Sequence, residues 1–312
     1  MLFVFCLIVI KRIRFFVSEK KSKKIRHDLS KLVGDCLEKK RTLNSIKLVC
    51  SQYILLEVLE GYNLRFSGDD WKQLNSLLSQ RFLLPKARRW VKSWFWLKRN
   101  FAARVFALAP LSKDESHIVQ LTQDRSFLVR SVASVAAVKL ESKRGVLNIL
   151  HNMHQELGYA HVYYSDILSQ GSNQVFNWVA EVAAEHKALH LVCLEVLAGK
   201  TAPVATPFLN EDFQAKNAKI RQAALKVAIR NPQKGNEKIF SSCLEDPDEE
   251  IRILGSMGLG NYPVKEGYAA LQKGASDSSW KVRLECAKSL KKLGKIHLLK
   301  DPEMVQYVLE FV

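Results

Sequence analysis

Cysteine is scarce in this chain of 312 residues, and no two cysteines stand at the short spacing of a metal-binding or redox pair. The six cysteines are scattered along the sequence, at Cys6, Cys36, Cys50, Cys193, Cys243 and Cys286. Unpaired cysteines are typical of a reducing compartment, so the pattern argues against a secreted fold held by disulfides. It also argues against a zinc site built on paired cysteines.

The signatures of common enzymes are missing as well. The sequence has no glycine-rich phosphate loop and no nucleophile elbow. Two histidine pairs have spacings that can ligate a metal, His151 with His154 and His186 with His190. No glutamate or cysteine completes either pair at a usual spacing. We therefore expect no catalytic residue, no cofactor and no metal site, and predict that the chain is not an enzyme.

A long apolar run is also lacking, although the chain opens with a short one. Residues 1–10 are all apolar, and Lys11, Arg12 and Arg14 then interrupt the run. Ten helical residues span about 15 Å, whereas the hydrocarbon core of a bilayer is about 30 Å thick. The segment could end a longer membrane helix, lie in the membrane interface, or form a buried terminal helix. We predict a transmembrane or interfacial anchor over 1–17, followed by a basic linker over 18–27.

Positive charge is concentrated beside this apolar segment. Residues 1–100 hold 22 Lys and Arg against 8 Asp and Glu, whereas residues 101–312 hold 26 against 23. Basic residues next to a membrane segment mark its cytoplasmic side and attract anionic lipid. The sequence therefore predicts a body in the cytoplasm, with the Lys11–Arg26 region on an anionic membrane surface.

What the chain does have is a dipeptide that returns at a fixed interval. An apolar residue followed by arginine occurs at Val129-Arg130, Ile220-Arg221, Ile251-Arg252 and Val282-Arg283. The last three pairs are 31 residues apart, and the first lies 91 residues before the second. A fixed period of this length indicates a protein built from structural repeats. Such proteins offer a long surface for partners and no ready-made catalytic centre.

A stripe of small and apolar residues follows the apolar residue of each dipeptide. The stripe also follows Lys98 and Leu189, which stand 31 residues before Val129 and Ile220. Four residues later the side chain is small, at Ala102, Ala133, Cys193, Ala224, Gly255 and Cys286. Eight residues later it is apolar, at Phe106, Ala137, Leu197, Ala228, Leu259 and Leu290. Spacings of four and eight put both positions on one helical face. We expect the small residues to let a neighbouring helix approach closely.

Loop-forming residues frame each stripe. An aspartate stands six residues before the arginine at Asp124, Asp246 and Asp277, which predicts a loop and a helix cap. Glycine or proline should end the helices at Pro110, Gly199, Pro232, Pro263 and Gly294. An interval of 31 residues leaves room for two helices of roughly 11 to 13 residues. The sequence therefore predicts an all-α fold, a right-handed α-solenoid of antiparallel helix pairs.

Three stretches resemble the HEAT-repeat family, in its short bacterial form that is found also in phycobilisome-lyase-like proteins: LTQDRSFLVRSVASVAAVKL, CLEDPDEEIRILGSMGLG and ASDSSWKVRLECAKSLKKLG. The resemblance covers about 98–295 and weakens between 141 and 188, where no arginine stands in register. It implies that recurring aspartates and arginines tie neighbouring repeats together. That structural role falls here to Asp124, Arg130, Arg221, Asp246, Arg252, Asp277 and Arg283.

Residues 28–95 do not follow the repeat, and we predict a helical cap there, with the repeats filling 96–312. One helix should end at Gly61, and another should start at Ser67 to Asp70 ahead of Trp71. A basic and aromatic cluster follows, made of Arg88, Arg89, Trp90, Lys92, Trp94 and Trp96. These residues could contact a partner or a membrane interface, stack on nucleic-acid bases, or form part of a core stripe.

Taken together, these patterns predict a membrane-anchored adaptor without catalytic activity, which binds a protein partner and is accessory to a membrane enzyme. Nucleic acid is not the expected partner, because the repeats are nearly balanced in charge. A nucleic-acid-binding module of the DNA-repair type is the first alternative, and strong salt dependence of binding would mark it. Tetrapyrrole handling of the phycobilisome-lyase type is the second, and it depends on the resemblance alone.

Overall fold

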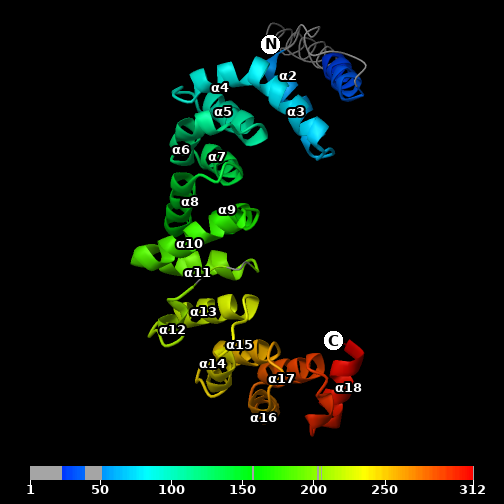
Figure 1. Ribbon diagram of the computed structural model, residues 1–312, viewed down its shortest axis with the longest axis vertical. Coiled ribbons are helices and arrows are strands. Elements are labelled where there is room, and N and C mark those ends of the chain that lie inside the picture. The colour runs from blue at the N-terminus through cyan, green and yellow to red at the C-terminus, as the bar shows by residue number, and fades with distance from the viewer. Residues whose placement is uncertain (1–22, 39–50, 157, 202–203, 205, 312) are drawn as a thin grey trace, which may run out of the picture. The chain divides into compact units, whose positions relative to one another are not determined.

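A computed structural model of the chain describes residues 23–38, 51–156, 158–201, 204 and 206–311. Across these residues all regular secondary structure is helical, as Figure 1 shows. The chain divides into two compact units, residues 1–148 and 149–312, and the boundary falls within helix α8 (Lys143–Gln155). The predicted all-α fold of paired helices is therefore confirmed.

The first unit contains a helical segment at 23–37 and then a series of helices that pack as neighbours in sequence. Their bounds are α2 (Gln52–Asn63), α3 (Asp69–Leu78), the π-helical turn η2 (Ser79–Leu83), α4 (Leu84–Trp90), α5 (Trp96–Leu108), the 3₁₀ turn η3 (Ser112–Asp114), α6 (Glu115–Thr122) and α7 (Phe127–Lys139). Helix α4 packs on α5, α6 packs on α7, and the second helices of these pairs, α5 and α7, pack on each other. This is the arrangement of stacked helix pairs.

The second unit repeats the arrangement. Its helices are α9 (Tyr159–Ser169), α10 (Asn173–Glu185), α11 (His190–Ala198), α12 (Leu209–Asp212), α13 (Ala218–Arg230), α14 (Asn236–Cys243), α15 (Glu249–Leu259), α16 (Lys265–Gly274), α17 (Trp280–Lys292) and α18 (Pro302–Phe311), with 3₁₀ turns at η4 (Lys187–Leu189) and η5 (Ile296–Leu298). The second helices α11, α13, α15 and α17 pack on one another in order, while α14 and α16 cover α15 and α17.

The predicted stripe lies in the interior. Every small position and every apolar position of the stripe is buried. The close approach is most evident at Gly258, where an added Cβ would lie 2.2 Å from the ring of Phe240 in the paired helix α14. At Gly255 an added Cβ would lie 2.9 Å from the Phe240 carbonyl oxygen. Small residues in α15 therefore set how closely α14 packs on it.

Helix ends agree with the predicted turn residues in the repeats and differ from the prediction at Gly61. Helices α5, α11, α13, α15 and α17 end within four residues before the predicted glycine or proline. Helix α2, however, passes through Gly61 and ends at Asn63. Helix α3 begins at Asp69 with Gly68 as its N-cap, within the predicted start at Ser67 to Asp70. Asp69 and Asp70 lie in the first turn, where negative charge is favourable.

The prediction of a membrane anchor needs a correction. Among the residues that the structure describes, no helix is both long and apolar enough to cross a bilayer. A repeat helix such as α7, with 13 residues, spans about 20 Å, short of the hydrocarbon core of about 30 Å. The transmembrane helix and the membrane location that depended on it are therefore not retained. Residues 1–17, on which the prediction rested, lie outside the described residues.

Candidate functional site

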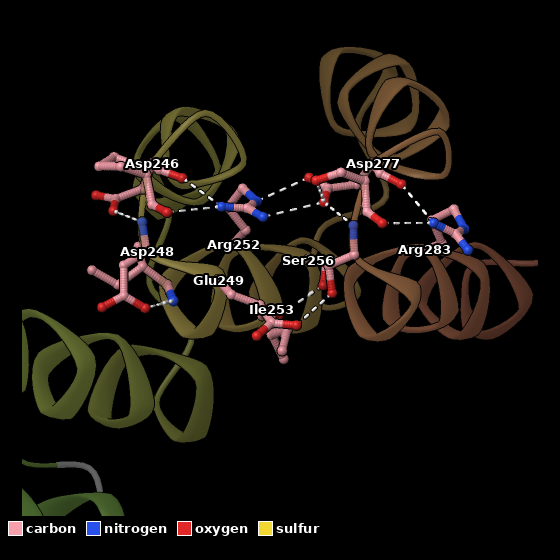
Figure 2. Close-up of polar contacts among 12 residues, drawn as sticks. Asp246, Asp248, Glu249, Arg252, Ile253, Ser256, Asp277 and Arg283 are labelled. Carbon is pink, nitrogen blue, oxygen red and sulfur yellow. Dashed lines mark hydrogen bonds and ion pairs between the residues drawn. The ribbon is translucent and has the colours of Figure 1, made fainter.

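Arg252 joins two repeats with a single guanidinium group, as Figure 2 shows. Its Nε and Nη2 donate to the two carboxylate oxygens of Asp277 in the next repeat, at 2.9 and 3.2 Å. Its Nη1 donates to the carbonyl oxygens of Asp246 and Pro247 in its own loop, at 3.0 and 3.1 Å. The planar fork of arginine suits this double task, because it can meet a carboxylate and two carbonyls at once.

The same contacts recur along the chain. Arg283 donates to the carbonyl oxygens of Asp277 and Ser278 at 2.8 and 3.0 Å (Figure 2). Arg221 donates to the Ala215 carbonyl at 2.9 Å, and its guanidinium lies 3.8 Å from the Asp246 carboxylate. Both aspartates also fix their own loops: Asp246 accepts from the Asp248 backbone N–H and Asp277 accepts from the Ser279 N–H, each at 2.8 Å.

In the first unit Arg99 takes the place that Arg252 has in the second. It binds both carboxylate oxygens of Asp124, and its side chain is only 8 % exposed. Arg130 donates to the Asp124 carbonyl at 2.7 Å. The sequence offered a signal for Arg99, because it stands 31 residues before Arg130, although we did not place it among the predicted structural residues. Together these contacts support a structural role for the recurring arginines and aspartates.

The electrostatics of these pairs follow from their burial. Burial raises the pKa of Asp277, but hydrogen bonds from the Ser279 N–H and from Arg252 outweigh it, so the pKa lies below its ordinary value. The hydrogen bond to Asp124 raises the pKa of Arg99 further above its already high value. Asp277 and Arg99 therefore stay charged at neutral pH.

A second set of contacts, which the sequence did not predict, ties the opposite ends of the second helices. Lys139 Nζ donates to the Ala107 carbonyl at 2.7 Å, and Asn261 Nδ2 donates to the Ile229 carbonyl at 3.1 Å. Each reaches back to the end of the second helix before it, where carbonyls lack helical partners. The donor lies 32 residues after the acceptor in both cases. This spacing, close to the 31-residue period, is the feature of the sequence from which these contacts could have been predicted.

The predicted basic and aromatic cluster separates into interior and surface residues. Arg88 binds both carboxylate oxygens of the buried Asp114, at 2.7 and 2.9 Å. Trp90 is half-buried and packs edge-on against the Phe101 ring, with Lys86 over its own ring. The exposed members are Arg89, Lys92, Trp94 and Trp96. These four are the members most accessible to a partner.

A groove opens on the face formed by the second helices of the second unit. Its volume is about 710 Å³, and it extends over α11, α13, α15 and α17. Its charged lining consists of Lys226, Arg230, Lys288 and Lys292, with Glu250 and Glu285. Its apolar lining includes Ile229, Leu254 and Met257. We did not predict the groove, although Lys226, Met257 and Lys288 stand in the 31-residue register.

The groove is basic within a unit that is neutral as a whole. Residues 149–312 hold 19 Lys and Arg and 19 Asp and Glu, whereas the groove holds four cations and two carboxylates. Of these, Glu285 is already paired with Lys288 at 3.6 Å. The distribution favours a ligand with negative charge.

Two cysteines of the second unit are buried and His190 is partly buried, whereas His151, His154 and His186 are exposed. Burial raises the pKa of both Cys193 and Cys286 to about 12, so these thiols stay protonated and unreactive at neutral pH. His190 lies 2.7 Å from the Ala183 carbonyl through Nδ1 and 2.8 Å from Asp212 Oδ1 through Nε2. Among the described residues no group of three or more potential metal ligands gathers.

A family model described as HEAT repeats matches residues 236–312. No curated protein matches the chain. The match carries no support for the phycobilisome-lyase-like subtype that the sequence suggested. Together with the helix pairs and the arginine–aspartate contacts, it identifies residues 236–312, from α14 to α18, as HEAT repeats within an all-α, HEAT-like solenoid fold.

Proposed function

We propose that this chain is a non-catalytic adaptor that binds a protein partner in the groove over α11, α13, α15 and α17. The groove itself carries the proposal, since it is a hollow of about 710 Å³ formed by stacked second helices. Stacked repeats present extended surfaces of this kind to other proteins. The groove combines an apolar floor at Leu254 and Met257 with cations on both sides.

The partner segment should be acidic. Lys226 and Lys288 lie two repeats apart, one on each side of Met257, which occupies the equivalent position of the middle repeat. Neighbouring packed helices lie about 8 to 10 Å apart, so the two lysines frame an apolar centre on which one side chain can rest. An acidic segment with an apolar residue between its carboxylates has the matching pattern.

Site-specific photocrosslinking in cells would test the proposal. A photoreactive residue in place of the exposed Met257 is expected to form an adduct with a protein partner. The same residue in place of Ala269, exposed on α16 outside the groove, is the matched control. Charge reversal by Lys226→Glu with Lys288→Glu should abolish the Met257 adduct. Identical adducts from both positions, or adducts indifferent to charge reversal, would exclude the groove as the binding site.

The two alternatives have less support. Nucleic-acid binding depended on the segment 86–99, where Arg88 is held by Asp114 and Trp90 packs on Phe101. Two of the six residues proposed for stacking and phosphate contact are thus engaged within the protein. Tetrapyrrole handling rests on no residue that we can name. Binding of single-stranded DNA that weakens steeply with salt would revive the first alternative.

A further inference from the structure

The loop before α5 departs from the pattern of the chain's own repeats. The residue four positions before the arginine is the helix N-cap, and it is polar in the later repeats: Ser126, Asn217, Asp248 and Ser279. In the first repeat this position is Phe95, whose side chain caps nothing. Its backbone is the same, with φ −86° and ψ 114° against −78° and 112° at Asn217. An aromatic residue therefore occupies a position that favours a polar cap.

The aromatic residues of this loop are exposed. Trp94 is 83 % exposed, Phe95 43 % and Trp96 39 %, and Leu128 of the next repeat is 54 % exposed beside them. Trp94, Phe95, Trp96 and Leu128 line a hollow of about 460 Å³ with Arg99 and Arg125. We name these four apolar residues, with Arg125, the aromatic patch. Exposed apolar groups gathered in this way are typical of interaction sites.

The loop backbone is fixed, so the exposure of Trp94 is built into the fold. Arg99 Nη1 donates to the carbonyl oxygens of Ser93 and Trp94 at 2.8 and 2.9 Å. Arg125 Nη2 donates to the same Trp94 carbonyl at 3.0 Å. Because the loop backbone is already ordered, the loop loses little additional conformational freedom when a partner binds Trp94. Tryptophan and arginine are also the residues that most often dominate binding energy at interfaces.

The surroundings of the patch are strongly basic. Between Asp70 and Asp114 the sequence holds ten Lys and Arg and no Asp or Glu. Lys92 and Lys98, two residues before Trp94 and two residues after Trp96, are exposed, as is Arg125 within the patch. The carboxylate of Asp124 in the next repeat is bound to Arg99, and its side chain is 7 % exposed. The patch is therefore an apolar centre with a positive rim.

From these observations we infer a second binding surface, independent of the groove: the aromatic patch docks a protein segment that places one large apolar side chain between carboxylates. The apolar side chain enters the hollow beside Trp94, and the carboxylates face Lys92, Lys98 and Arg125. A second copy of the chain joined patch to patch is disfavoured, because these cations would face their own counterparts.

Selection from a phage-displayed library of random short peptides on the full-length protein tests this inference. Enriched peptides are expected to carry an aromatic residue or leucine flanked by Asp or Glu. Synthesised, such a peptide should bind at least about tenfold more weakly to Trp94→Ser and to Phe95→Asn. Each variant installs a residue that other repeats use at the same position, Ser278 and Asn217, so the fold should be kept.

Two control variants distinguish the aromatic patch from the groove and from the loss of any exposed tryptophan. Trp280→Ser, three residues before Arg283 as Trp96 is before Arg99, and the groove variant Lys226→Glu with Lys288→Glu should bind the peptide as the wild type does. If only the groove variant loses binding, the selected peptides bind at the site of the proposed function, and the second surface is overturned. It is also overturned if no peptide is enriched, or if the enriched peptides lack acidic residues.

Other occupants would show themselves in the same set of variants. An oligothymidine, or vesicles of phosphatidylcholine with phosphatidylserine, that bind wild type and fail to bind Trp94→Ser would assign the patch to nucleic acid or lipid instead. Concentration-dependent self-association lost in Trp94→Ser would assign it to a second copy. Indifference of all these probes to Trp94→Ser, with peptide binding lost, is the result that we expect.

Discussion

At the scale of a single residue, Arg252 has two structural roles in this fold. Its two guanidinium edges contact the loop of its own repeat and the carboxylate of the next, so it fixes both a helix start and a repeat junction. The side chain is 15 % exposed, which keeps water from competing for these hydrogen bonds. Lysine would keep the charge and lose the fork.

Replacing Arg252 by lysine should therefore destabilise the protein by about 1 to 3 kcal/mol, since buried acceptors lose their donors. Urea denaturation followed by circular dichroism measures the difference. Arg230→Lys is the matched control: it makes the same change on the exposed end of α13, and about 0.5 kcal/mol or less is expected. Equal losses from both variants would show that the fork of Arg252 contributes nothing.

Asp277 should make stability depend on pH in the acid range. Its pKa in the folded protein lies below the ordinary value of 3.8, so the folded protein holds the proton less tightly than the unfolded chain. The stabilisation is complete above 3.8 and is lost as pH falls through the folded pKa. Asp277→Asn should be less stable at neutral pH and lose less on acidification. Parallel stability curves for the two proteins would contradict this.

At the scale of a helix, α5 begins without the polar cap that α13 and α15 have. The Asn217 side chain accepts from the Lys219 backbone N–H, and Asp248 accepts from the N–H groups of Glu250 and Ile251. Phe95 leaves the equivalent N–H groups of α5 without such an acceptor. Ser126 and Ser279 likewise make no side-chain cap hydrogen bond, so α5 differs from α7 and α17 only in having an aromatic residue at this position.

Phe95→Asn should consequently stabilise the protein by about 0.5 to 2 kcal/mol, the usual value of an N-cap. Thermal denaturation would register it as a higher midpoint. The reverse change, Asn217→Phe, should lower the midpoint by removing an existing cap. A lower midpoint for Phe95→Asn would mean that the Phe95 ring supports the fold rather than a partner.

Replacing a glycine by alanine should have opposite effects on stability at Gly258 and at Gly61, because their packing differs. At Gly258 a methyl group would meet the Phe240 ring at 2.2 Å, so Gly258→Ala should cost about 1 to 3 kcal/mol through overpacking. At Gly61 an added Cβ meets nothing within 4 Å, and alanine there should stabilise α2 by about 0.5 to 1 kcal/mol. Denaturant midpoints that move in the same direction for both variants would refute this account.

Glycines also show where reading the sequence succeeds and where it does not. Gly255 belongs to the periodic stripe, and periodicity identifies the buried face because it repeats the same packing many times. Gly61 stands alone, and it was predicted to end a helix because glycine often does. The helix continues through it because Gly61 has no left-handed backbone here, so nothing in its conformation stops α2.

At the scale of the whole molecule, charge is distributed unevenly along the chain. This distribution predicts which part of the protein binds polyanions non-specifically. The stretch from 71 to 113 holds ten cations and no carboxylate, whereas 149–312 is balanced. Charge reversal at Arg89 and Lys92 should lower the salt concentration that elutes the protein from a cation exchanger more than reversal at Lys226 and Lys288. Equal shifts would mean that local charge density does not control adsorption.

The binding surfaces were harder to predict than the repeats. Structural arginines and aspartates recur with the period, so one sequence reveals them. The groove depends on which side of each second helix faces solvent. The aromatic patch depends on Phe95 breaking the cap pattern, and that exception is visible only after the caps are aligned. The sequence does not show that Arg88 binds Asp114 or that Trp90 packs on Phe101, so both residues were predicted as possible surface contacts.

The spacing of the arginine–aspartate contacts also bears on how the chain acquires its structure during synthesis. Arg99 and Asp124, Arg221 and Asp246, and Arg252 and Asp277 are each 25 residues apart. A ribosome adds about 5 to 20 residues per second, so each arginine waits about 1 to 5 s for its aspartate to be made. Each of these three junctions can therefore close while the following repeat is still being translated. Contacts this local favour rapid folding, and folding can advance from the amino end one repeat at a time.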